Sequence, residues 1–204
     1  MSLPDNMGGA NKDAQSNGET ITAHFIAHQR LVEQSLRELP PLAAQTAAVL
    51  IQALRRGHKV IAFGNGGSAT QASHLVAELL GRFNATRQPF PAIALASDSG
   101  TTTCISNDFG FDVLFERQVT ALAQPGDIAV GLTTSGRSEN VRRGLLAARE
   151  RGAITIALTG AAGLVEGTAD YILVVPGTST ANIQEVHLML LHAWCLCLDQ
   201  SLGV

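Results

Sequence analysis

Residues 60–78 read VIAFGNGGSATQASHLVAE. Four apolar residues, Val60 to Phe63, predict a short strand, and the glycine-rich run from Gly64 to Ser68 predicts a turn that opens a helix. Glycines let the backbone approach an anion closely, and the free N–H groups at a helix N-terminus favour phosphate. His74 and Glu78 lie four residues apart, so they share one face of the predicted helix, which suits acid–base chemistry or a metal. This one segment is therefore predicted to bind an anion and to carry reactive groups beside it.

Apolar runs like the one at Val60 recur along the chain and alternate with helical patterns. They occupy residues 92–95, 127–132, 154–158 and 171–175. The runs are continuously apolar rather than alternating, which is typical of parallel strands buried on both faces. Alternation of such strands with helices predicts a doubly wound α/β fold, in which helices flank a five-stranded parallel sheet in a flavodoxin-like three-layer sandwich.

Three further helices are predicted outside the alternating region. Two N-terminal helices precede it, from Thr20 to the Pro40-Pro41 break and over residues 42–56, and one follows it over residues 181–202. The last helix is apolar on most of its faces, which indicates burial on more than one side. Two interpretations are open: a homo-oligomer assembled through these helices, or a terminal helix clamped on the sheet.

Length and composition limit the classes of function. The chain has 204 residues, enough for one well-packed domain, and its formal net charge of −3 argues against a broad nucleic-acid-binding surface. We expect a single domain over residues 20–204, preceded over residues 1–19 by a flexible leader rich in Gly, Asn, Asp and Ser. No run approaches the roughly 18 apolar residues of a membrane span. The three cysteines form no even framework, which favours a reducing, cytoplasmic location.

Three loops that follow predicted strands are rich in groups that hold phosphate. Besides Gly64 to Ser68, they are residues 133–138, TTSGRS, and residues 97–103, SDSGTTT. Such residues are also ordinary turn formers, so one loop alone is weak support for a site. Ligands collect where parallel strands end, however, and several such loops before helices favour binding. No Walker or dinucleotide motif is present, and hydroxyls with backbone amides suit a monoester phosphate on a small sugar.

Together these motifs resemble the sugar isomerase (SIS) domain family, and more narrowly its phosphoheptose isomerase branch, from about Thr20 to the C-terminus. The resemblance is carried by the glycine run at 64–68, HLVAEL at 74–79, NDFG at 107–110, TTSGRS at 133–138, and IQEVH at 183–187 with His192. The chain departs from the family at Thr133, where Ser is common. It also lacks, over residues 179–182, a charged residue that relatives often place before Gln184.

The resemblance implies an aldose–ketose isomerase that converts sedoheptulose 7-phosphate to D-glycero-D-manno-heptose 7-phosphate. That reaction is the first step towards the nucleotide-activated heptoses of lipopolysaccharide and other bacterial surface polysaccharides. The resemblance also implies a homotetramer whose active sites lie at subunit interfaces. It implies Glu78 as the base, His192 as the acid–base partner, and one zinc ion per subunit. The implied zinc ligands are His74, Glu78, Gln184 and His192.

The same resemblance implies the groups that bind the sugar phosphate. Ser68, Ser135, Ser138 and a hydroxyl of Thr133 or Thr134 grip the phosphate, and Asn65 and Asp98 contact the sugar. The backbone at Gly66 and Gly67 and the side chain of Gln184 complete the implied binding set. We expect no nucleic-acid or membrane partner.

The chemistry of such an isomerase suits these residue types. Moving a proton between C1 and C2 through an enediol needs a base at carbon and a second group at the oxygens, roles that fit a carboxylate and a histidine. A metal could polarise the carbonyl group. Gln184 and His192 lie eight residues apart, a helix rise of about 12 Å, so they meet at one ion only if both side chains lean inwards or two subunits contribute. His187 is left open as a core histidine, an interface histidine or part of a neighbouring site.

Two other functions fit the same fold. A non-catalytic regulator that binds a replication initiator resembles this chain in its loops, but it lacks the acid and the second histidine. Since Glu78 and His192 are both present, the enzyme is favoured. A sugar-phosphate-sensing domain of a transcription factor is disfavoured, because no DNA-binding segment precedes the predicted fold.

Overall fold

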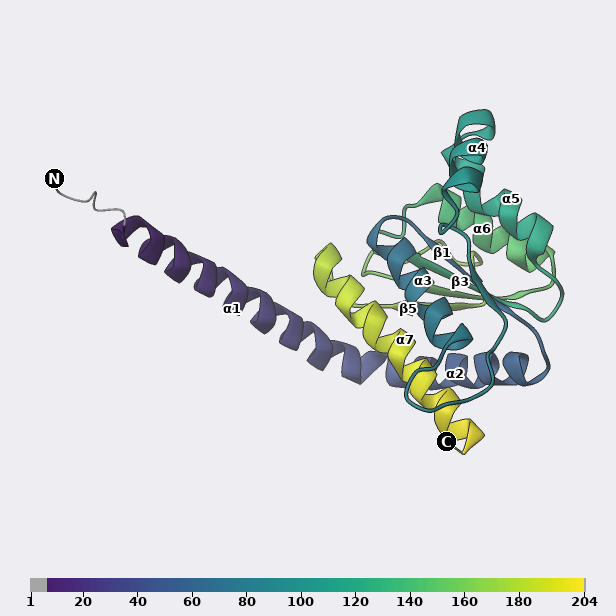
Figure 1. Ribbon diagram of the computed structural model, residues 1–204, viewed down its shortest axis with the longest axis horizontal. Coiled ribbons are helices and arrows are strands. Elements are labelled where there is room, and N and C mark those ends of the chain that lie inside the picture. Colours follow the sequence, from purple (N-terminus) through teal and green to yellow (C-terminus); the bar gives the residue numbers. More distant parts are fainter. Residues whose placement is uncertain (1–6, 204) are drawn as a thin grey trace.

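The computed structural model describes residues 7–203 and consists of a parallel sheet between two layers of helices (Figure 1). The strands are β1 (Val60–Gly64), β2 (Ala92–Ala94), β3 (Ile128–Thr133), β4 (Ile154–Thr159) and β5 (Tyr171–Val174). The α-helices are α1 (Met7–Glu38), α2 (Pro40–Arg55), α3 (Gly67–Leu80), α4 (Ser99–Phe109), α5 (Leu114–Leu122), α6 (Glu139–Glu150) and α7 (Thr180–Leu202), and a short 3-10 helix covers Phe111–Val113. All five predicted strands are present, each close to its predicted bounds.

Helices bury the sheet on both faces. Successive side chains of a strand point to opposite faces, so each strand contributes to both cores. On β1, Val60 and Ala62 pack into the core formed with α2, α3 and α7, whereas Ile61 and Phe63 pack into the core formed with α5 and α6. Every pair of neighbouring strands is parallel. The predicted doubly wound, three-layer α/β fold is therefore confirmed.

The strand order is β2-β1-β3-β4-β5. From β1 the chain first runs outwards to β2, and it then returns to the other side of β1 to form β3. The point where the order reverses, between β1 and β3, is where ligands bind in open α/β sheets. Gly64 at the end of β1 pairs with Leu132 near the end of β3. The glycine loop (residues 64–68) and the hydroxyl loop (residues 133–138) therefore emerge side by side.

Two helices between β2 and β3, α4 and α5, were not predicted from the sequence. Helix α4 has no buried residue, so it lacks the apolar stripe that marks an amphipathic helix. It begins at Ser99, within the third predicted phosphate loop at residues 97–103. The prediction of a loop there is wrong, because Asp98 caps a helix at this point.

Helix α1 begins at Met7, well before the predicted start at Thr20, so helical structure reaches into the segment predicted as a leader. Residues 1–6 of that segment lie outside the described residues. Much of α1 extends away from the body as a single helix (Figure 1). Its apolar side chains at Ile21, Phe25 and Leu36 are 56%, 67% and 71% exposed. Across residues 7–203, no helix is long and apolar enough to cross a membrane.

Candidate active site

The glycine loop makes a sharp turn between β1 and α3. Gly66, the N-cap of α3, has a φ of +54°, in the region that favours glycine. A Cβ on Gly67 would collide with the side-chain amide of Gln184 on α7. Glycine is thus needed here both for the turn and for the close approach of α7. Ser68 lies inside the first turn of α3 and is buried.

A pair of asparagines ties the glycine loop to the start of α6. Asn65 and Asn140 exchange two side-chain amide hydrogen bonds, each 2.9 Å long, and Asn140 is only 2% exposed. Within the hydroxyl loop, the Oγ atoms of Thr133 and Ser138 lie 3.1 Å apart. These hydrogen bonds hold the two loops in a fixed arrangement. Asn140 was not predicted as a site residue, because a lone asparagine in a helical pattern has no distinctive signal.

A cavity of about 240 Å³ opens between the two loops and the start of α7. Leu132 and Thr180 contribute to its lining. The rest of the lining consists of predicted binding residues: Asn65, Gly67, Ser68, Thr133, Thr134, Ser135, Ser138 and Gln184. Apart from Leu132, the lining groups are hydroxyls, side-chain amides and backbone. Among the residues that the structure describes, no charged side chain lines the cavity. The N-termini of α3 and α6 flank the cavity, where the positive ends of the helix dipoles favour an anion.

Asp98 lies outside the lining of this cavity. Its exposed carboxylate accepts hydrogen bonds from the backbone N–H groups of Gly100 and Thr101, at 3.1 and 3.0 Å, and from the Thr101 hydroxyl. These bonds, that of the hydroxyl above all, lower the pKa of Asp98. The structure places Asp98 as the cap of α4, and its contact with the sugar stays a prediction.

His74, Glu78 and His192 form a compact group, called here the acid–base cluster. The Nε2 atoms of His74 and His192 lie 2.9 Å apart, and His74 Nε2 lies 3.4 Å from Glu78 Oε1. The Phe83 ring centroid is 5.3 Å from that of His192. The side chains of His74 and Glu78 are 41% and 20% exposed, so solvent and small molecules reach them. Residues far apart in sequence, on α3 and α7, are thus brought together within one chain.

Gln184, the fourth predicted metal ligand, lies at the cavity instead. Its side chain packs against Gly67, and its backbone carbonyl accepts a 2.6 Å hydrogen bond from the Gln71 amide. Across residues 7–203, no group of three or more His, Cys, Asp or Glu residues is arranged to hold a metal ion. The 2.9 Å between the Nε2 atoms of His74 and His192 is a hydrogen-bond distance. The nitrogens of two imidazole ligands of a tetrahedral zinc ion lie about 3.4 Å apart, so the two rings would have to separate to bind one ion.

Comparison with known proteins covers most of the chain. A sequence profile of the SIS domain matches residues 24–160. The phosphoheptose isomerase of Pelobacter propionicus is 45% identical over 90% of this chain and 98% of its own length. That of Aquifex aeolicus is 51% identical over 76% of this chain and 81% of its own. The chain belongs to the phosphoheptose isomerase family of SIS-domain proteins.

Solved structures of this family have the same fold. The phosphoheptose isomerase of Neisseria gonorrhoeae superposes with a TM-score of 0.82 at 41% identity, covering 90% of this chain and 98% of that one. The enzyme of Francisella tularensis superposes with a TM-score of 0.86 at 37% identity and the same coverage. The agreement extends over nearly the whole length of these relatives.

His187, whose role the sequence left open, is a core residue. Its side chain is fully buried, and its Nε2–H donates a 3.3 Å hydrogen bond to the Thr159 carbonyl. Burial lowers the pKa of His187 to about 4, so the ring is neutral near pH 7. A neutral, enclosed imidazole cannot serve the acid–base cluster directly.

Glu185 joins α1 to the start of α7, a contact that was not predicted from the sequence. Its two carboxylate oxygens lie 2.7 Å from His24 Nε2 and 2.7 Å from His28 Nδ1. The Asn182 amide donates a further hydrogen bond of 3.1 Å to the same carboxylate. Helix α1 is thereby fixed beside Gln184, although His24 and His28 lie outside every recognised motif.

Proposed function

We propose that this protein interconverts sedoheptulose 7-phosphate and D-glycero-D-manno-heptose 7-phosphate as an aldose–ketose isomerase. The observation that carries the proposal is the pairing of an uncharged, hydroxyl-lined cavity with the acid–base cluster along α3. The names of the relatives described above support the same substrate. They offer no support for the non-catalytic regulator.

Helix α3 carries both halves of the proposed site. Ser68 lies in its first turn at the cavity, and His74 and Glu78 follow six and ten residues later, a rise of about 9 to 15 Å. A ketose 7-phosphate has its phosphate on C7 and its carbonyl group at C2. A sugar phosphate held by its phosphate at the start of α3 therefore reaches the acid–base cluster with its opposite end.

The proposed reaction moves protons between neighbouring atoms of the substrate. The Glu78 carboxylate takes a proton from C1 and delivers it to C2, so the C1–H bond breaks and a C2–H bond forms through an enediol. His192 gives a proton to the ketose oxygen at C2 and takes one from the oxygen at C1. The electron pairs shift within the substrate, so the isomerisation needs no oxidant or reductant.

We also propose that the acid–base cluster holds a zinc ion. Two imidazoles and a carboxylate form a donor set that zinc commonly takes. His74, Glu78 and His192 would hold the ion, in place of the hydrogen bond between the two rings, and Gln184 remains the fourth predicted ligand. When bound, zinc supplies Lewis-acid polarisation of the substrate oxygens. Metal analysis of the purified protein tests the zinc proposal, and the expected result is one zinc ion per chain.

The proposed assembly is a homotetramer with active sites at its subunit interfaces. The exposed apolar side chains on α1 support it, together with Met189 and Leu196 on α7, which are 46% and 43% exposed. An apolar groove of about 340 Å³ between α1, α2 and α7 adds to this surface. Exposed apolar patches of this kind mark interaction sites. Light scattering is expected to give the mass of four chains, and a monomer would contradict the assembly.

The proposed substrate and the three free cysteines are consistent with a cytoplasmic enzyme. The activity is tested directly by incubating the purified protein with sedoheptulose 7-phosphate, with and without a chelator, and following the aldose by NMR. We expect turnover that falls when the metal is removed and returns when zinc is added. Absence of turnover with zinc present would contradict the isomerase, and turnover unaffected by the chelator would contradict the zinc.

A further inference from the structure

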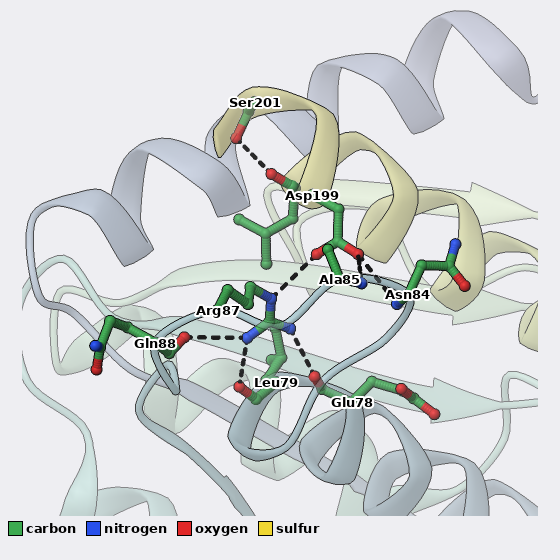
Figure 2. Close-up of polar contacts among 9 residues, drawn as sticks. Glu78, Leu79, Asn84, Ala85, Arg87, Gln88, Asp199 and Ser201 are labelled. Carbon is green, nitrogen blue, oxygen red and sulfur yellow. Dashed lines mark hydrogen bonds and ion pairs between the residues drawn. The ribbon is translucent and has the colours of Figure 1, made fainter. Parts of the chain in front are cut away.

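Arg87, in the segment between α3 and β2, is buried although it carries a charge. Its side chain is 3% exposed and that of its partner, Asp199 on α7, is 5% exposed. The Arg87 Nε–H donates to Asp199 Oδ1 at 3.1 Å (Figure 2). A buried charge pair of this kind needs nearly complete hydrogen bonding to be tolerated. The two terminal nitrogens of Arg87 supply the further hydrogen bonds.

Besides a 3.3 Å hydrogen bond to the Gln88 carbonyl, the remaining Arg87 donors bind the last turn of α3, at the residue proposed as the base. One terminal nitrogen donates to the backbone carbonyl of Glu78 at 2.6 Å, and the other to that of Leu79 at 3.0 Å (Figure 2). Carbonyls at the end of a helix lack helical partners, because no further turn supplies their N–H donors. The rigid fork of the guanidinium thus fixes the backbone of Glu78 itself.

Asp199 fixes the same assembly to the helix that carries His192. It lies seven residues after His192, which is two turns of α7, within about 20° of the same face. Its other carboxylate oxygen accepts hydrogen bonds from the backbone N–H groups of Asn84 and Ala85, at 3.2 and 3.4 Å. The Arg87–Asp199 pair therefore links the end of α3 to the face of α7 that contacts His74.

We propose that Arg87, anchored by Asp199, is a positioning residue that sets the Glu78 carboxylate relative to His192. The inference rests on the proposed isomerase function, in which Glu78 and His192 move the protons. Apolar packing also joins the end of α3 to α7, since Leu79 shares a core with Leu191 and Leu198, but it is the Arg87 side chain that holds the Glu78 carbonyl directly. The cavity lies at the other end of α3, so the link affects the proton transfers and leaves the phosphate grip unchanged.

A simple structural role makes a different prediction, and two variants separate the alternatives. Arg87→Lys keeps a charge for Asp199 but loses the fork that holds both carbonyls. The double variant R87M/D199L replaces the buried pair by apolar side chains, a change that often leaves stability intact or raises it. Neither variant holds the Glu78 and Leu79 carbonyls as the wild type does. Lys59→Met is the matched control, because it removes a largely buried ion pair, Lys59–Asp127, that joins the segments just before β1 and β3 rather than α3 and α7.

Initial rates with sedoheptulose 7-phosphate are measured at 25 °C, and thermal midpoints are measured on the same samples. For Arg87→Lys we expect kcat to fall tenfold or more, since a shift of about 1 Å in reacting groups can cost about 100-fold. KM should change less than about twofold, because the cavity is untouched. In R87M/D199L we expect the thermal midpoint to stay near the wild-type value while kcat stays low. Lys59→Met should lower the midpoint and leave kcat unchanged.

Wild-type kcat in Arg87→Lys, or recovery of kcat together with stability in R87M/D199L, would overturn the inference. A second readout does not depend on turnover: the NMR ring chemical shifts of His74 and His192, recorded at one fixed pH in histidine-labelled protein. These shifts report how the two rings lie relative to Glu78, so Arg87→Lys should change them and Lys59→Met should not. An inactive wild type would count against the isomerase alone. Unchanged ring shifts in Arg87→Lys would count against the positioning role.

Discussion

The two ends of α3 present different kinds of chemical groups. At its N-terminal end, backbone, hydroxyls and amides line a cavity whose loops are cross-linked by Asn65 and Asn140. Towards its C-terminal end, His74 and Glu78 meet His192 as titratable and partly exposed side chains. In the proposed function, the first end binds an anion without a fixed positive charge, and the second moves protons. Substitutions at the two ends should therefore change different kinetic constants.

The largest expected effect is at the C-terminal end. Glu78→Gln keeps the size of the side chain and removes the proposed base, so kcat should fall about 1,000-fold. Initial rates with sedoheptulose 7-phosphate measure this loss. Glu150→Gln, an exposed change at the end of α6, is the control and should keep wild-type rates. Activity of Glu78→Gln within about twofold of wild type would exclude Glu78 as the base.

A smaller effect is expected at the N-terminal end of the same helix. In Gly67→Ala the added Cβ meets the Gln184 amide and pushes α7 away from the glycine loop. KM and the Kd for inorganic phosphate should rise about tenfold, which corresponds to about 1.4 kcal/mol, with kcat changed little. Calorimetry with inorganic phosphate measures the affinity.

The control for that experiment is Gly100→Ala. Its Cβ would make only ordinary contacts with the Asp98 carboxylate, the nearest at 3.5 Å. This variant should bind phosphate as the wild type does. A fall in kcat without a change in phosphate affinity in Gly67→Ala would contradict the division of labour along α3.

The smallest effect on catalysis is expected at His187, which lies between Gln184 and His192 on α7 but serves neither end. Its pKa is lowered from 6.5 to about 4 in the folded protein, so the unfolded chain takes up the proton first as the pH falls. Stability should therefore decline between about pH 6.5 and pH 4, by at most about 1.4 kcal/mol per pH unit from this group. His187→Gln keeps a hydrogen-bond donor for the Thr159 carbonyl and removes the titrating group. The free energy of unfolding should therefore depend less steeply on pH in this variant.

Urea unfolding of wild type and His187→Gln at several pH values measures that slope. Rates near pH 7.5 should be equal in the two proteins. An identical pH dependence of stability in the variant would show that His187 does not titrate as its burial requires. A loss of kcat at pH 7.5 would instead bring His187 into the active site.

Much of the fold could be predicted from the sequence because it depends on local pattern. Continuous apolar runs mark parallel strands, and the glycine and hydroxyl loops follow the two strands that flank the switch point. Helix α4 escaped prediction because it buries no residue, and its capping by Asp98 looked like a phosphate loop. A pattern of buried side chains cannot reveal an element that has none.

The residues of the candidate site were proposed from the sequence, whereas their contacts could not be predicted from it. His74 and Glu78 share a helix, so their proximity follows from their spacing, whereas the contact of His74 with His192 depends on how α3 packs against α7. The spacing of Gln184 and His192 predicts that they meet at one ion only if both side chains lean inwards or two subunits contribute. In the structure, Gln184 lines the cavity and His192 contacts His74. Arg87 was missed because a charged residue in a loop is ordinarily solvated, and only packing shows it buried.

Binding of sedoheptulose 7-phosphate to Glu78→Gln, followed by calorimetry, tests the separation of binding from chemistry most directly. With turnover removed, the variant is predicted to bind the ketose with a Kd within about threefold of the wild-type KM, because the cavity at the start of α3 is unchanged (about 0.7 kcal/mol). Adding Gly67→Ala to the same variant should weaken that binding about tenfold. Loss of binding in Glu78→Gln, with normal binding in Gly67→Ala, would contradict the account.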